Sequence, residues 1–292
     1  MTAVGGFLNV LKPPGISSHD VVGEVRRIFQ TKKVGHAGTL DPGAAGVLPV
    51  AVGRATRLIE YLEHERKAYR AELQLGVSTD TGDLGGKLRK REPVTFPTAD
   101  QIEQTLAQFR GKITQVPPAH SAVKIGGVRA YALARSGAAV EIPSREVTIY
   151  ALTLQRADAA RHTLLLDVAC SRGTYIRSLC VDIGRALGVP AVMSFLVRTR
   201  VGDFALTDAY TIEELRTAGE QALLAPETML LGLPRYDLPA GRERAFCNGL
   251  STHDVRLATY TAAYLQVYGG GQFLGIGRLE GENVIPAKVM IS

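Results

Sequence analysis

The segment GHAGTLDPGAAGVLPVAVGRATRL, residues 35–58, carries the strongest functional signal in the chain. It starts as a glycine-rich loop in which His36, Thr39 and Asp41 lie close together, and it continues into the apolar strand pattern VLPVAVG at 47–53. An Asp-Pro pair often only begins a turn. A polar loop that leads directly into a buried strand, however, is where reactive side chains usually lie. We therefore predict a functional site here, with no regular element over residues 31–46.

Strand and helix patterns alternate on both sides of this loop. In KAYRAELQLG, residues 67–76, Tyr69, Ala71, Leu73 and Leu75 share one face of a predicted strand. The turn STDTGDLGG follows. The other predicted elements are strands at 6–12, 145–155 and 163–170, and helices that start at Ser17 or Ser18 and span 54–65, 98–110 and 176–187.

The texture of the sequence changes near residue 233. Short apolar runs such as YLQVY and FLGIG are separated there by glycine-containing turns, which is typical of a small all-β unit. The mixture of strands and helices before it indicates an α+β fold. We expect a domain at 1–232 and a small β-rich domain at 233–292.

The bulk composition favours a cytoplasmic protein that meets phosphate. The net charge is +6 and the pI is about 9.3, which suits contact with nucleic acid without proving it. The three cysteines form no CxxC pair, so neither a disulfide framework nor a zinc site is expected. The first residues do not resemble a signal peptide, and no apolar run is long enough to span a membrane.

Five blocks of the sequence resemble the TruB family of tRNA pseudouridine-55 synthases. The Asp41 segment matches the signature GHAGTLDPxAxGVLPVxxGxATRL. The further blocks are KAYRAELQLGVSTDTGD at 67–83, PPAHSAVKIGGVRAYALARSG at 117–137, CSRGTYIRSLCVDIGRALG at 170–188 and LVRTRVGDF at 196–204. FLGIGRLEGENVIPAKVM, which begins at Phe273, is similar to the end of a PUA-type RNA-binding domain.

The resemblance implies a fold and a reaction. The fold would be a pseudouridine-synthase-like mixed β-sheet flanked by helices, with an RNA-gripping insertion at about 117–145 and a PUA-like C-terminal domain. The reaction would isomerise uridine 55 in the T loop of tRNA after the base has left the stack. An isomerisation requires no cofactor or metal. We expect tRNA as the partner, no obligate protein partner, and a monomer.

Three residues are implied in catalysis by their positions in these blocks. Asp41 matches the family's catalytic aspartate, which attacks either the ribose or the uracil ring and must be ionised to do so. Arg177 matches the arginine that pairs with it and favours the ionised form. Tyr69 matches the tyrosine that packs against the target base, although a purely structural role on its strand is also open.

Further residues are predicted to bind the substrate. His36 and Leu196 match residues near the flipped base, and either could instead be structural. Four cations are candidate phosphate contacts, namely Lys12, Lys32, Lys33 and Arg135. The full predicted substrate-binding set is His36, Gly38, Thr39, Lys12, Lys67, Lys124, Arg129, Tyr175 and Leu196.

Some features depart from the family or do not fit a site. Val197 stands where the family often has the first of two arginines, which leaves Arg198 as a candidate RNA contact. Gly43 and Ala45 differ from commoner choices in the Asp41 loop. Asp80 and Asp83 are interpreted as turn residues and not as metal ligands, because Asp, Thr and Gly favour turns.

Three other functions compete with this one. An RNA-binding module without catalysis would suit the basic charge but would not need Asp41, Tyr69 and Arg177 together. A synthase guided by RNA or acting on ribosomal RNA is disfavoured by the compact length without basic extensions. A glycosidase would need a second catalytic carboxyl group, and none stands out.

Overall fold

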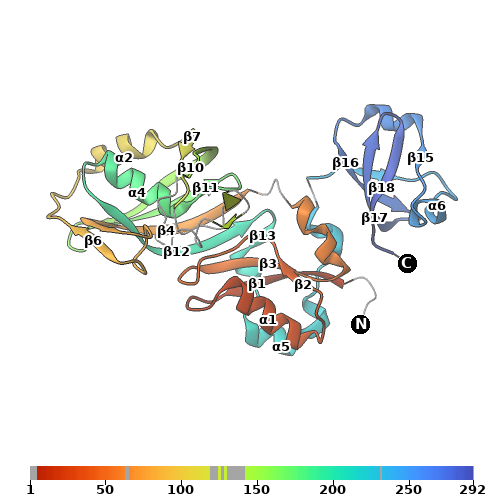
Figure 1. Cartoon of the computed structure of the whole chain (residues 1–292), viewed down its shortest axis with the longest axis horizontal. Helices are drawn as coiled ribbons and strands as arrows, with labels where there is room; N and C mark the ends of the chain where they lie inside the picture. The colour runs from red at the N-terminus through yellow and green to blue at the C-terminus, as the bar shows by residue number, and fades with distance from the viewer. Residues whose placement is uncertain are drawn as a thin grey trace.

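The computed structural model describes residues 5–62, 66–118, 124–125, 128–129, 142–230 and 232–291. Two β-sheets organise these residues, a larger one in the N-terminal part and a smaller one at the C-terminal end (Figure 1). The structural comparisons described below confirm the predicted α+β class with a β-rich C-terminal unit. No described helix has the length and apolar character needed to cross a membrane.

The larger sheet has nine strands and is mixed. The order along its main path is β1-β3-β12-β4-β11-β10-β7, while β2 pairs with β3 and β13 pairs with β12. Neighbours on the path are antiparallel except β3 and β12, which run parallel. The strands are β1 (Gly5–Lys12), β2 (Val34–His36), β3 (Ala45–Gly53), β4 (Lys67–Leu75), β7 (Gly111–Gln115), β10 (Arg145–Asp158), β11 (Thr163–Cys170), β12 (Ala191–Val201) and β13 (Phe204–Ala205).

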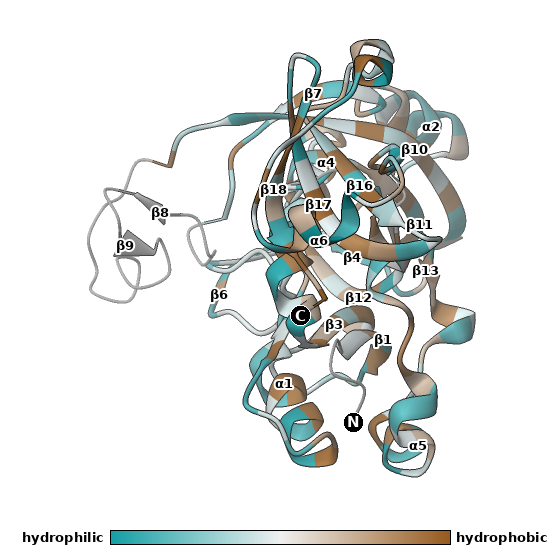
Figure 2. Ribbon diagram, turned by 90° about the vertical axis from the view of Figure 1, so that its right-hand side faces the viewer, coloured by the Kyte–Doolittle hydropathy of each residue, from teal (hydrophilic) through white to brown (hydrophobic). Residues whose placement is uncertain are grey.

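Helices cover the two halves of this sheet. The helix α1 (Ser18–Ile28) lies beside α5 (Ile212–Ala218) under β1 and β3, as Figures 1 and 2 show. On the other half, α2 (Ala99–Ala107) and α4 (Ile176–Ala186) pack on β4, β10 and β11. The apolar faces match the sequence patterns, since Ala71, Leu73 and Leu75 of β4 are all buried.

Short elements complete the chain. The N-terminal part also has two hairpins, β5 (Val77–Thr79) with β6 (Leu88–Arg91) and β8 (Lys124–Ile125) with β9 (Val128–Arg129). Its 3-10 helices are η1 (Arg54–Tyr61), η2 (Leu206–Asp208), η3 (Gly219–Ala222) and η4 (Pro226–Met229). The smaller sheet has the order β14-β16-β17-β18-β15. Its region contains β14 (Arg235–Asp237), α6 (Glu243–Cys247), β15 (Thr252–His253), η5 (Val255–Thr259), β16 (Tyr264–Gly269), β17 (Gln272–Glu280) and β18 (Asn283–Val289).

Two sequence predictions of local structure need correction. Residues 31–46 contain a short strand, β2, because Val34 can pair with Val52 of β3 and bury its side chain. The helix predicted from residue 54 is a 3-10 helix that ends at Tyr61. The first helix has Ser17 as its N-cap, one of the two predicted starts, and both hydrogen bonds of a capping box are present at Ser17 with Asp20 and at Thr98 with Gln101.

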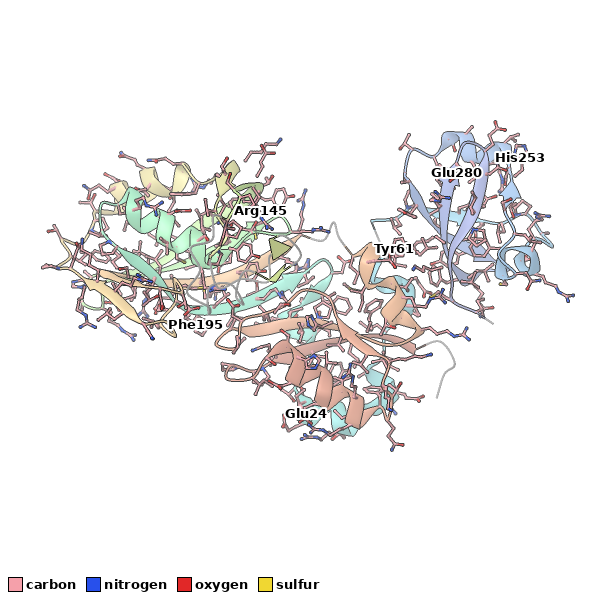
Figure 3. All side chains as sticks on the ribbon, in the orientation of Figure 1. Glu24, Tyr61, Arg145, Phe195, His253 and Glu280 are labelled. Carbon is pink, nitrogen blue, oxygen red and sulfur yellow. The ribbon has the colours of Figure 1, made fainter. Side chains whose placement is uncertain are left out.

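The smaller sheet packs against the larger one through a shared apolar cluster. Phe7 and Val47 of the larger sheet lie in one core with Phe273, Ile276 and Met290. Tyr61, which Figure 3 shows at this junction, meets Tyr264 edge-to-face with ring centroids 5.1 Å apart. The two sheets are therefore joined by buried apolar contact and not only by the connecting chain.

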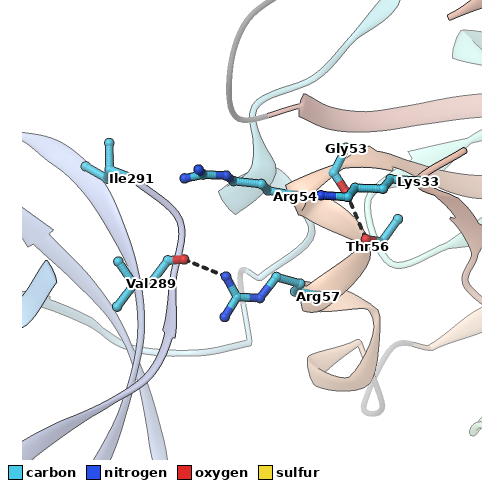
Figure 4. A pocket seen from close by; sticks show the side chains of 7 residues that line it. All are labelled: Lys33, Gly53, Arg54, Thr56, Arg57, Val289 and Ile291. Carbon is cyan, nitrogen blue, oxygen red and sulfur yellow. Dashed lines mark hydrogen bonds between the residues drawn. The ribbon is translucent and has the colours of Figure 1, made fainter. Parts of the chain in front are cut away.

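A basic cleft of about 470 Å³ lies at the same junction (Figure 4). Arg57 crosses it to donate to the Val289 carbonyl at 2.9 Å, and Arg54 donates to the Met290 carbonyl at 3.1 Å. The lining residues are Lys33, Gly53, Arg54, Thr56, Arg57, Val289 and Ile291. These two hydrogen bonds tie η1 to the end of the C-terminal unit.

The parallel contact between β3 and β12 requires a glycine at position 46. Gly46 has φ +113°, and an added Cβ would overlap the Arg198 carbonyl oxygen of β12.

We predict that Gly46→Ala lowers the free energy of unfolding by roughly 2–5 kcal/mol, through backbone strain and overpacking. Gly43→Ala, in the same loop with open space around it, should stay within about 1 kcal/mol of wild type. Denaturant unfolding compares them; equal losses would contradict this role of Gly46.

Candidate functional site

The loop that carries Asp41 connects β2 to β3 and is held at several points. The Ser18 hydroxyl accepts from the Leu40 amide at 2.9 Å and donates to the Leu40 carbonyl at 3.1 Å. The Gly15 amide donates to the Pro42 carbonyl at 2.8 Å. The first turn of α1 and the segment before it therefore fix both sides of Asp41, whose own side chain remains 40% exposed.

Lys12 is buried beneath the Asp41 loop and binds backbone carbonyls there. This burial corrects the prediction that Lys12 contacts phosphate. Its side chain is fully buried, and its ammonium donates to the carbonyls of Pro13, Pro42 and Ala44 at 2.9, 3.1 and 2.6 Å. Burial lowers the pKa of Lys12 to about 8, although the nearby Asp41 charge opposes this shift. Its donors are used to hold the backbone around Asp41.

Arg177 meets Asp41, as the sequence predicts. The Arg177 Nε lies 3.0 Å from one oxygen of Asp41, and its Nη2 donates to the other at 3.3 Å. Arg177 stands in the first turn of α4, and its side chain is only 7% exposed. A two-pronged contact of this kind orients the carboxylate as well as attracting it.

Asp83 is a site residue that the sequence interpretation missed. It lies in the predicted turn, where its Oδ1 accepts from Thr81 and Gly85, but its other oxygen is 3.7 Å from Arg177 Nε. The Thr81 carbonyl accepts from Arg177 Nη1 at 3.0 Å. The turn thus also contacts the arginine that pairs with Asp41, and only the three-dimensional fold brings it there.

The pKa of Asp41 is set by opposing influences. Burial raises it most, and the Asp83 charge raises it further, while the Arg177 and Lys12 charges lower it. The net direction is upward. The sequence argument that Arg177 favours the ionised form gives one of these contributions correctly but omits the burial that outweighs it.

Tyr69 and Leu196 belong to one buried apolar cluster that also contains Leu40, the residue before Asp41. They come from the adjacent strands β4 and β12 and are 8% and 7% exposed. Burial raises the pKa of the Tyr69 phenol, and the neighbouring Arg198 charge acts against this rise. A phenol with a raised pKa remains neutral near pH 7, so its ring is the part suited to contact with a base.

Arg198 is fully buried, contrary to its interpretation as an RNA contact. It has no exposed surface, and no described carboxylate lies within ion-pair distance. Its Nε donates to the Val47 carbonyl at 2.7 Å and its Nη2 to the Gly38 carbonyl at 3.1 Å. These two carbonyls lie on either side of Asp41 in the sequence, so one guanidinium spans the loop.

Several other predicted residues surround this centre. His36 is partly buried, its pKa is lowered by burial and by Arg198, and its Nδ1 has no partner among the described residues. Burial lowers the pKa of Lys67 to about 8. Gly38 has φ +88°, and a Cβ added to it would lie 3.2 Å from the Lys67 ammonium nitrogen. Thr39 is exposed beside them.

The remaining predicted contacts are less closely placed. Tyr175 is the N-cap residue of α4, and its ring lies 5.6 Å from the Arg145 guanidinium. Lys32 and Lys33 are exposed. For Lys124 and Arg129 only the paired backbone of β8 and β9 is described, and Arg135 lies outside the described residues. Within the described residues no group of His, Cys, Asp or Glu is arranged to hold a metal ion.

The comparisons with known proteins agree on one family. The model of the TruB family pseudouridylate synthase N-terminal domain matches residues 26–176, and that of the tRNA pseudouridylate synthase B C-terminal domain matches 177–230. A tRNA pseudouridine synthase B from Caldanaerobacter subterraneus subsp. tengcongensis is 46% identical over 98% of this chain and 99% of its own. The chain belongs to the TruB family of pseudouridylate synthases.

Other members and solved structures support this membership. A tRNA pseudouridine synthase B from Moorella thermoacetica is 52% identical over 85% of this chain and 83% of its own. The chain in a crystal structure of a Cbf5-Nop10-Gar1 complex superposes with a TM-score of 0.76 at 26% identity, covering 99% of this chain and 85% of that one. The TruB membership makes this protein an isomerase that forms pseudouridine.

Substitution of Arg198 changes two opposing contributions to the free energy of unfolding, the desolvation of its charge and its hydrogen bonds to two carbonyls. Arg198→Met removes a buried cation, which saves several kcal/mol of desolvation, but leaves two carbonyls unpaired at about 1–3 kcal/mol each. We expect unfolding free energy within about 2 kcal/mol of wild type, and pseudouridine formation slowed roughly 10²-fold because the Asp41 loop loses its anchor.

Arg200→Met is the matched control, since Arg200 lies two residues along β12 and is exposed. It should change neither quantity appreciably. The two readouts are denaturant unfolding and the single-turnover rate. Normal turnover in Arg198→Met would contradict the positioning role, and a loss of stability well above about 3 kcal/mol would show that the side chain is mainly structural.

Proposed function

We propose that this TruB protein isomerises uridine 55 in the T loop of tRNA, with Asp41 as its nucleophile. The observation that carries the proposal is the two-pronged ion pair between Asp41 and Arg177 on a clamped loop. A carboxylate that only stabilised the fold would not need to be both held in one orientation and 40% exposed. The names of the similar proteins supply tRNA as the substrate.

The chemistry follows from the placement of these groups. The target uridine leaves the RNA stack, and its base packs on the Tyr69 ring and the Leu196 side chain. Asp41 attacks the nucleoside, the glycosidic bond to N1 breaks, the base turns, a bond forms from the ribose to C5, and the bond to Asp41 breaks again. The C5 hydrogen leaves as a proton and N1 takes up a proton, so the product is an isomer of the substrate. Arg177 keeps the attacking carboxylate oriented throughout.

We propose that the chain acts alone on tRNA, as a monomer in the cytoplasm. The free cysteines Cys170, Cys180 and Cys247 support a reducing compartment. The structural relatives include a chain in an H/ACA RNP bound to a substrate RNA. A guide-dependent reaction is thus the second candidate, and purified protein with tRNA alone distinguishes the two.

The proposal is tested by tritium release from tRNA labelled at uridine C5. Wild-type protein alone should release tritium, because isomerisation expels the C5 hydrogen. Asp41→Asn should still bind tRNA but release tritium at least about 10⁴-fold more slowly, as expected when a nucleophile is removed. Asp100→Asn, an exposed carboxylate at the start of α2, is the control and should resemble wild type.

Two outcomes would contradict parts of this proposal. Release by Asp41→Asn at a rate near wild type would remove Asp41 as the nucleophile. Absence of release by wild type, despite tight binding of tRNA, would favour another RNA target, a guide requirement or a binding function without catalysis.

The opposing influences on Asp41 predict a pH dependence. Only the ionised carboxylate is a nucleophile, so kcat/KM falls as the pH drops through the pKa of Asp41. This pKa is raised, and Asp83 is one cause. Asp83→Asn removes a neighbouring negative charge and makes ionisation easier, so the acid limb of the profile should move to lower pH.

Asp182→Asn is the control for this shift. Asp182 is a carboxylate on α4, the helix that carries Arg177, and it pairs with Arg185 at 3.0 Å. The acid limb of the kcat/KM profile of Asp182→Asn should coincide with that of wild type. An acid limb that stays in place or moves to higher pH in Asp83→Asn would contradict the electrostatic account.

A further inference from the structure

The hairpin of β5 and β6 carries a dense group of cations. Lys87, Arg89, Lys90 and Arg91 occupy four of five consecutive positions, and all four are exposed. Figure 1 places β6 at the end of the larger sheet that lies farthest from the C-terminal unit. This group is therefore separate from the basic cleft at the junction.

Most of these charges have no compensating partner among the residues that the structure describes. Lys90 forms an ion pair with Glu92, the next acidic residue along the chain. For Lys87, Arg89 and Arg91, no carboxylate among the described residues lies within ion-pair distance. Like charges held close together repel one another, and an anionic partner would relieve that repulsion.

The hairpin is joined to the active site through its tip. The Lys87 amide donates to Asp80 Oδ1 at 2.7 Å, and the Asp80 amide donates to the Lys87 carbonyl at 3.1 Å. The residues that follow Asp80 are those that hold Arg177, through the Thr81 carbonyl and the Asp83 carboxylate. The cations thus begin at the edge of the catalytic centre.

A β-bulge alters the direction of the strand at this group. Ser78 pairs with Lys90 and Thr79 with Leu88, so Arg89 is the additional residue on β6. A bulge turns a side chain away from the regular alternation and is frequent beside active sites. Arg89 is therefore not confined to the face shared by regularly paired residues.

We propose that this basic hairpin binds the sugar-phosphate backbone of the tRNA strand next to the target uridine. The inference rests on the proposed function, since it assumes that tRNA is the substrate. Lys87, Arg89 and Arg91 each contact a phosphate. The segment VSTDTGDLGGKLRKRE, residues 77–92, has no aromatic side chain on which a base could stack, and Lys and Arg side chains commonly contact phosphate oxygens.

A second role for such charges is protection of an exposed sheet edge against pairing with another chain. The two roles differ in what the cations do to RNA affinity. Edge protection predicts aggregation when the charges are removed, with normal affinity in the remaining monomer. Backbone binding predicts weaker, less salt-dependent RNA binding by a protein that stays monomeric.

The test is a salt titration of tRNA binding by the triple variant Lys87→Gln, Arg89→Gln and Arg91→Gln. Each lost phosphate contact should reduce the slope of log affinity against log salt by roughly 0.7–0.9, so three lost contacts should reduce it by about 2.1–2.7. Affinity near about 0.1 M salt should fall roughly tenfold or more. KM should rise, while kcat at saturating tRNA should stay near wild type.

Two control variants sharpen the result. A charge-conserving triple variant, Lys87→Arg, Arg89→Lys and Arg91→Lys, should bind tRNA as wild type does. Lys90→Gln, an equally exposed cation on the same strand that is already paired, should change the slope little. Size-exclusion chromatography of each variant reports aggregation.

An unchanged affinity and slope in the monomeric neutral variant would overturn the proposal. This result is distinct from failure of the proposed function, which appears as absence of tritium release by wild-type protein. If wild type releases tritium and the neutral variant binds normally, only the hairpin assignment fails. If wild type binds tRNA without release, the slopes still show whether these cations contact phosphate.

Discussion

The Arg198 guanidinium is a full charge placed inside the protein without a described carboxylate to balance it. It is held by the backbone carbonyls of Gly38 and Val47, at 3.1 and 2.7 Å, which lie on either side of the Asp41 loop. Burial of this charge costs several kcal/mol. Its two hydrogen bonds hold the Asp41 loop in one conformation. Gly46 must then be a glycine, because β3 passes too close to the Arg198 backbone for a side chain.

Several buried and half-buried charges set the electrostatic balance in the site. Lys12 and Lys67 have pKa values lowered to about 8, and the Arg198 charge contributes to both shifts. Arg177 stands between the carboxylates of Asp41 and Asp83. Cations in the site outnumber these two acids, which suits an RNA substrate, while burial keeps the pKa of Asp41 above its usual range.

Sequence patterns predict the parts of this structure that depend on local spacing. The alternation from Tyr69 to Leu75 locates β4, and Ser17 with Asp20 locates the start of α1. The partnership of Asp41 and Arg177, 136 positions apart, came from the family resemblance and not from spacing. The family and its reaction are confirmed by the comparisons, whereas the roles assigned to individual residues stay predictions.

Other features depend on tertiary contacts that no local pattern contains. Lys12 looks like an exposed cation in sequence, yet it is buried because Pro42 and Ala44 place their carbonyls over it. Asp83 looks like a turn residue, and it is one, but the turn also packs against Arg177. The pattern of β2 is obscured by Gly35 and by the glycine-rich loop that follows, and the strand forms because β3 offers it an edge.

The most direct test of the assignment of Asp41 is a crystal structure of the Asp41→Asn variant with a tRNA T arm. We expect the target uridine to be out of the stack, with its base against Tyr69 and the substituted amide side chain within about 3.5 Å of the nucleoside, the separation expected for reacting atoms. The Arg198 contacts to Gly38 and Val47 should be unchanged. A target base still stacked in the loop, or a different carboxylate nearest to the nucleoside, would contradict the assignment of Asp41 as the nucleophile.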